Sequence, residues 1–67
     1  MLQSQKLKGA ILEKKLTYEK CAKHLDISIT AFCNKVNGRT EFTCAEVSRL
    51  SNLLKLSDND KINIFLN

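Results

Sequence analysis

The sequence contains no proline or tryptophan, and its 67 residues include only two glycines, three phenylalanines and one tyrosine. With so few aromatic residues, the interior must be assembled mainly from aliphatic side chains, which favours packed helices. A chain this short is expected to form a single domain over residues 1–67, which excludes a multi-domain enzyme. A core of this size supplies only about 3–5 kcal/mol of net stability, so a binding module is expected rather than a deep catalytic cavity.

Long hydrophobic runs are also missing. No apolar stretch approaches the roughly 20 residues needed to cross a bilayer, and the N-terminus lacks the charged and apolar segments of a signal peptide. The three cysteines, Cys21, Cys33 and Cys44, are odd in number and widely spaced, unlike the disulfide framework of a secreted mini-protein. We therefore expect a cytoplasmic protein with reduced thiols and no membrane partner.

Residues suited to catalysis are scarce as well. The single histidine has no partner that the sequence supports, no nucleophile has a neighbouring base, and the two glycines lie too far apart to form a phosphate-binding loop. Four side chains are of the types that hold zinc: Cys21, His24, Cys33 and Cys44. The helical register points them in different directions, so we expect no metal, no cofactor and no enzyme activity.

Positive charge is in modest excess and is concentrated near the N-terminus. The formal net charge is +4, and up to Lys23 the six lysines are opposed only by Glu13 and Glu19. Such a balance suits a polyanion such as DNA, although ordinary solvated surfaces also carry surplus lysines.

Apolar residues recur at intervals of three and four, the period of amphipathic helices, and outline five helical segments. The first spans about residues 4–15, and Thr17 is suited to cap the second. The inward-facing residues are Leu7, Ile11, Leu12 and Leu16 for the first segment, and Cys21, Ala22 and Leu25 for the second.

A tight turn is predicted at Asp26 and Ile27, because aspartate tolerates a left-handed backbone better than most residues. Ser28 then caps a third segment, residues 29–36, and Gly38 is suited to end it. The buried ridge of this segment is Phe32 and Val36, and its outer face carries Ile29, Thr30, Cys33, Asn34 and Asn37.

Thr43 and Glu46 have the spacing of a capping box, in which the hydroxyl and the carboxylate satisfy exposed amides at a helix start. They open the fourth segment, and Ser57 caps a short fifth one. The inward positions are Val47, Leu50 and Leu54 in the fourth segment, and Ile62 and Phe65 in the fifth.

A short helix, a tight turn and a second short helix with a small-polar outer face are the parts of a DNA-binding helix-turn-helix. From Leu16 the chain reads LTYEKCAKHLDISITAFCNKVNG, and here it resembles the Cro and phage-repressor (XRE) family over about residues 7–56. The chain departs from the family pattern at Asp26, where a turn glycine is usual, and at Tyr18, where glutamine is usual. The matching positions are Ala22, Leu25, Ile27, Ser28, Phe32, Asn37, Gly38, Val47, Leu50 and Leu54.

The resemblance implies an all-α, lambda-repressor-like domain that binds double-stranded operator DNA as a transcriptional regulator of phage type. In such relatives the outer residues of the third helix enter the major groove. The base contacts implied are Ile29, Thr30, Cys33 and Asn34. The phosphate contacts implied are Tyr18, Ser28, Lys35, Asn37, Arg39 and Thr40.

Two further expectations concern protein partners. The outer face of the third helix lacks arginine and carries Ile29, Ala31 and Cys33, so an alternative is a small phage modulator or antirepressor that binds a partner repressor protein. Relatives commonly pair on DNA to read two half-sites, and Ile64 and Leu66 are the candidate contacts of a homodimer.

Overall fold

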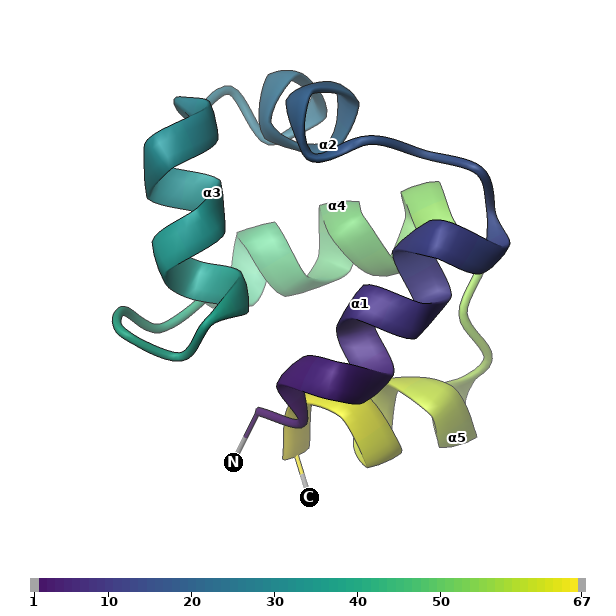
Figure 1. The fold of residues 1–67 in the computed structure, drawn as a ribbon. Coiled ribbons are helices and arrows are strands. Elements are labelled where there is room, and N and C mark those ends of the chain that lie inside the picture. Colours follow the sequence, from purple (N-terminus) through teal and green to yellow (C-terminus); the bar gives the residue numbers. More distant parts are fainter. Residues whose placement is uncertain (1, 67) are drawn as a thin grey trace.

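The computed structural model describes residues 2–66, which form five α-helices and a closing π-helical turn, with no strand among them. The elements are α1 (Ser4–Glu13), α2 (Tyr18–His24), α3 (Ile29–Val36), α4 (Cys44–Leu54), α5 (Asp58–Lys61) and η1 (Ile62–Leu66). Figure 1 shows α4 crossing behind α1, with α2 and α3 to one side of this pair and α5 to the other. The prediction of a small all-α bundle is confirmed.

Four of the helices begin at a side-chain cap, at the positions that the sequence predicts. The hydroxyls of Thr17, Ser28 and Ser57 each accept a hydrogen bond from the backbone amide three residues later, at 3.1 Å. At the start of α4, Thr43 and Glu46 form the complete capping box. Each such cap is worth about 1 kcal/mol, so these residues fix where the helices start.

The first four helices end in the same way, with one residue in the left-handed conformation. These residues are Lys15 after α1 (φ 58°), Asp26 after α2 (φ 59°), Gly38 after α3 (φ 81°) and Lys55 after α4 (φ 54°). Each helix closes with a pair of reversed hydrogen bonds; after α1, for example, Lys15 donates to the Leu12 carbonyl at 2.9 Å and Leu16 to the Ile11 carbonyl at 3.1 Å. This is the Schellman arrangement, and it confirms the left-handed turn predicted at Asp26.

The residue after each left-handed position decides how firmly the turn is held to the core. After α1, α2 and α4 this residue is Leu16, Ile27 or Leu56, and all three pack against the core. After α3 it is Arg39, which is exposed. The α3–α4 loop (residues 37–43) is therefore the only one of these four connections in residues 2–66 without an apolar anchor at this position.

The core draws on every helix from α1 to α4 and on η1. Its buried members are Leu7, Ile11, Cys21, Ala22, Leu25, Phe32, Val36, Leu50, Leu54 and Ile64. Most were expected from helical spacing. The prediction that Leu12 faces inward is wrong, because Leu12 is 77% exposed. Leu7 and Ile11 lie four residues apart on the buried face of α1, and Leu12, one residue further along the helix, points toward solvent.

The register of the C-terminal segment also differs from the prediction. Ile64 is only 5% exposed, whereas Ile62, expected in the core, is 51% exposed and Leu66 is 73% exposed. A π-helical turn is wider than an α-helical one, so the spacing rule that pairs Ile62 with Phe65 does not apply. Ile64 belongs to the core, which contradicts its prediction as a contact of a homodimer. Leu66 is exposed and remains a candidate for that contact.

Aromatic rings form a continuous row through the molecule. Tyr18 meets Phe32 edge to face with ring centroids 5.4 Å apart, Phe32 meets Phe42 at 6.1 Å, and Phe42 meets Phe65 at 5.7 Å. Edge-to-face pairs of this kind add about 0.5–1.5 kcal/mol each beyond their buried area. The row therefore ties α2, α3, the α3–α4 loop and η1 together.

Candidate nucleic-acid interface

The buried inner face of α3 determines which of its residues point away from the core. Phe32 and Val36 are both 0% exposed, which fixes the rotation of the helix. The base contacts implied by the family resemblance lie on the other side: Ile29 is 47% exposed, Thr30 is exposed, and Cys33 and Asn34 are half-buried. None of them is sealed inside the protein, so this face is open to a partner.

Tyr18 lies where α2 meets α3. It is the first residue of α2, directly after the Thr17 cap, and its ring packs edge-on against Phe32 of α3. Burial raises the pKa of the Tyr18 hydroxyl, and the neighbouring Cys33 and Cys21 add to the rise. The ring contact with Phe32 places Tyr18 at the α2–α3 junction.

The remaining polar candidates bracket α3 at its two ends. Ser28 is exposed at the start, where its oxygen accepts the Ala31 amide and its own proton remains free to donate. At the other end, Asn37 is exposed just before the Gly38 turn, and Arg39 and Thr40 are exposed just after it. A single α-helix such as α3, about 10–12 Å across with its side chains, fits the width of the DNA major groove, about 12 Å.

Two backbone hydrogen bonds hold Gly38 and Arg39 to the C-terminal end of α3. The amide of Arg39 donates to the Asn34 carbonyl at 2.9 Å, and the amide of Gly38 donates to the Lys35 carbonyl at 3.1 Å. Arg39 forms no ion pair within residues 2–66, so its guanidinium is left for solvent or for a ligand.

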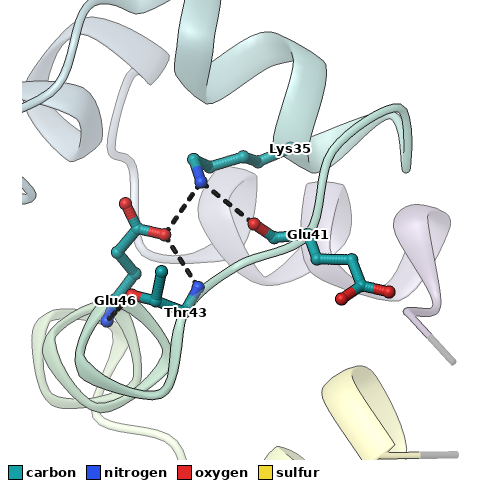
Figure 2. Close-up of polar contacts among 4 residues, drawn as sticks. All are labelled: Lys35, Glu41, Thr43 and Glu46. Atoms are coloured by element: carbon teal, nitrogen blue, oxygen red, sulfur yellow. Dashed lines mark hydrogen bonds and ion pairs between the residues drawn. The ribbon is translucent and has the colours of Figure 1, made fainter.

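Lys35, predicted as a phosphate contact, has two polar partners within the protein. Its Nζ lies 2.9 Å from Glu46 Oε1 and donates to the Glu41 carbonyl at 3.0 Å, and Figure 2 shows it directed at both groups. The side chains of Lys35 and Glu46 are each only 15% exposed. Lys35 is therefore paired within the protein, and we leave it out of the proposed phosphate contacts.

The sequence reveals only half of the role of Glu46. Its spacing from Thr43 predicts the capping box, and Oε1 indeed accepts the Thr43 amide at 2.8 Å. The same oxygen also accepts from Lys35, eleven residues earlier in the chain, a pairing that no local pattern signals. Burial works to raise the pKa of Glu46, but the bonds from Thr43 and Lys35 prevail and hold that pKa below its ordinary value.

Within residues 2–66, no three His, Cys, Asp or Glu side chains gather where they could hold a metal ion. Among the same residues, no helix combines the length and the apolar character needed to span a membrane. The three cysteines are free thiols at different depths: Cys21 is buried, Cys33 half-buried and Cys44 exposed.

Comparisons of the chain with protein-family models, with curated proteins and with solved structures found no match.

Proposed function

We propose that the protein is a sequence-specific, DNA-binding transcriptional regulator of the Cro or phage-repressor type, acting in the cytoplasm. The observation that carries this proposal is the exposed outer face of α3, bracketed by Ser28 at one end and by Arg39 and Thr40 at the other. In a helix-turn-helix protein this face enters the major groove while polar groups around it hold the phosphates.

The side chains on the outer face have the chemistry needed to read bases. The Asn34 amide can pair with adenine, the Thr30 hydroxyl can donate to or accept from several bases, and Ile29 can cover a thymine methyl group. A good bidentate contact is worth about 1–3 kcal/mol of discrimination, so Asn34 is the main expected determinant of specificity. Cys33 lies between these groups as a small, weakly polar contact.

The phosphate contacts in this proposal are predicted residues whose side chains donate no hydrogen bond within residues 2–66. They are Tyr18, Ser28, Asn37, Arg39 and Thr40. Arg39 carries the only full positive charge among them, so it is expected to make the largest contribution to the salt dependence of binding.

Selection from a pool of random double-stranded oligonucleotides tests the proposal whatever the sequence of the operator. The wild-type protein is expected to enrich one defined site. Asn34→Ala should lose preference at particular base pairs, whereas Arg39→Ala should weaken all sequences and reduce the slope of log K against log salt by about 0.9. Asn52→Ala and Arg49→Ala, the same changes on exposed residues of α4, are the matched controls. Absence of any enriched site for the wild-type protein would reject the proposal.

A second candidate function is favoured by a specific observation on the same face. Lys35, the one lysine of α3, is neutralised by Glu46, while Ile29 stays 47% exposed. An apolar surface without a free cation also suits a modulator that docks on a partner repressor protein. A stoichiometric complex with a purified repressor from the same locus, broken by Ile29→Asp and not competed by duplex DNA, would favour this second function.

Pairing of two copies on DNA is part of the proposal. Leu66 is 73% exposed and borders a groove of about 750 Å³ whose apolar lining includes Leu2, Phe42 and Phe65. Sedimentation with and without the selected duplex is expected to show two copies on the DNA, and Leu66→Ser should reduce this to one. A single copy for the wild-type protein on a palindromic site would contradict pairing.

A further inference from the structure

The contacts of Lys35 form a cluster that DNA contact does not use. Its ammonium reaches two segments at once: the carbonyl of Glu41 in the middle of the α3–α4 loop, at 3.0 Å, and the carboxylate of Glu46 in the first turn of α4, at 2.9 Å. The ammonium also lies 5.9 Å from the centre of the Phe42 ring. Figure 2 shows how these contacts bring α3, the loop and α4 to one point.

The turn that opens the α3–α4 loop lacks the apolar anchor of the other turns, and the loop meets the core again only at Phe42, near its other end. The turns after α1, α2 and α4 are pinned to the core by Leu16, Ile27 and Leu56, whereas Arg39 at the equivalent position is exposed. After Arg39 the backbone is held less closely, because the Thr40 amide donates to the Asn34 carbonyl at the longer distance of 3.4 Å.

We propose that Lys35 is a positioning residue that fixes the α3–α4 loop, residues 37–43, relative to the outer face of α3. Because its ammonium and the Glu46 carboxylate are largely shielded from water, their attraction is less screened than that of an exposed pair. The carboxylate is itself oriented by the Thr43 amide, so the ion pair holds a defined geometry.

The consequence for binding rests on the proposed function. Thr40 lies between the Arg39 amide, which is bonded to the Asn34 carbonyl, and the tether at Glu41, so Lys35 sets the position of Thr40 and of the loop beside the Arg39 side chain when a duplex arrives. Loss of Lys35 should weaken DNA binding by disordering these contacts in the free protein. It should not remove a phosphate contact of its own.

Backbone ¹⁵N relaxation of the free protein tests the tether without any DNA. In the wild-type protein, residues 40 and 41, between the Arg39 backbone bond and the packed Phe42 ring, are expected to have order parameters near those of a rigid backbone, about 0.85, and in Lys35→Met to fall below about 0.6. Lys35→Arg should restore order, because it keeps a donor cation. Lys14→Met, which removes a lysine from the exposed end of α1, should leave the loop unchanged.

Glu46→Gln provides a second variant in case Lys35→Met fails to fold. Glutamine preserves the capping box with Thr43 but removes the charge that holds Lys35. A smaller loss of order in the same residues is expected. Unchanged order parameters in the loop of Glu46→Gln and of any folded Lys35→Met would overturn the proposal.

Salt titrations with a fixed 20-base-pair duplex separate positioning from direct contact. Lys35→Met is expected to weaken binding with the slope of log K against log salt unchanged, whereas Arg39→Met should lower that slope by about 0.9. A slope lowered equally by Lys35→Met, with its loop still ordered, would show a phosphate contact and overturn the proposal. If the wild-type protein binds no duplex, the proposed function fails, and the relaxation data alone decide whether Lys35 positions the loop.

Discussion

Replacing Lys15 by glycine is expected to stabilise the protein, although lysine is the better helix former. Lys15 has φ 58°, a left-handed conformation that costs an L-residue about 1–2 kcal/mol. Glycine removes this cost but brings extra freedom to the unfolded chain, worth about 0.5–1 kcal/mol. Lys15 is exposed and forms no ion pair within residues 2–66, so its side chain contributes little to offset the gain. The net gain is about 0.5–1 kcal/mol, or roughly 3–6 °C in Tm for a domain of this size.

The neighbouring residue provides the matched control. Lys14 has φ −84°, which any residue adopts without strain, and it is also exposed. Lys14→Gly changes the charge by the same amount but relieves nothing, so it should destabilise by about 0.5–1 kcal/mol. Urea and thermal unfolding followed by circular dichroism measure both variants. If Lys15→Gly proves no more stable than Lys14→Gly, the left-handed turn at Lys15 stores no strain.

Three further outcomes are expected. Ser51→Ala should raise the free energy of unfolding by about 1 kcal/mol, because Ser51 Oγ is buried with no hydrogen-bond partner in the described structure. A loss of stability in urea would show instead that this hydroxyl has a hydrogen-bond partner. Phe32→Leu removes two of the three contacts of the aromatic row and should cost about 2–3 kcal/mol; a cost under about 1 kcal/mol would refute the role of the row. Folding lowers the pKa of Glu46, so Glu46 adds to the free energy of unfolding at pH values above its ordinary pKa of about 4.3. This stabilisation is lost as the pH falls through the lowered pKa of the folded state. Urea midpoints should therefore drop over that acidic range, and they should drop less in Lys35→Met.

Local chemistry made much of the fold predictable. Thr17, Ser28, Thr43 and Ser57 cap helices because a hydroxyl satisfies free amides wherever it precedes a helix, and this does not depend on the tertiary structure. The inward rotation of α3 followed in the same way from the four-residue spacing of Phe32 and Val36.

The errors arise where the local signal is ambiguous or absent. Lys15 and Lys55 adopt left-handed conformations with no glycine or asparagine to indicate them, because Leu16 and Leu56 draw the chain back to the core. The π-helical turn changes the face on which Ile64 lies, and spacing rules assume an α-helix.

The candidate site was predictable only in part, for a related reason. Which residues of α3 face outward depends on the periodicity of that helix alone. The position of the Lys35 ammonium depends on the Glu46 carboxylate, which lies in another helix and comes near Lys35 only when the chain folds. Sequence patterns therefore locate the outer face better than they locate the charges around it.

The position of Tyr18 has a practical value for solution studies. The chain has one tyrosine and no tryptophan, and that tyrosine packs on Phe32 at the seam between α2 and α3. Ultraviolet emission from the native protein therefore originates almost entirely at this seam. Unfolding, or the arrival of a ligand on the neighbouring surface, can be followed by fluorescence with no dye attached and no residue replaced.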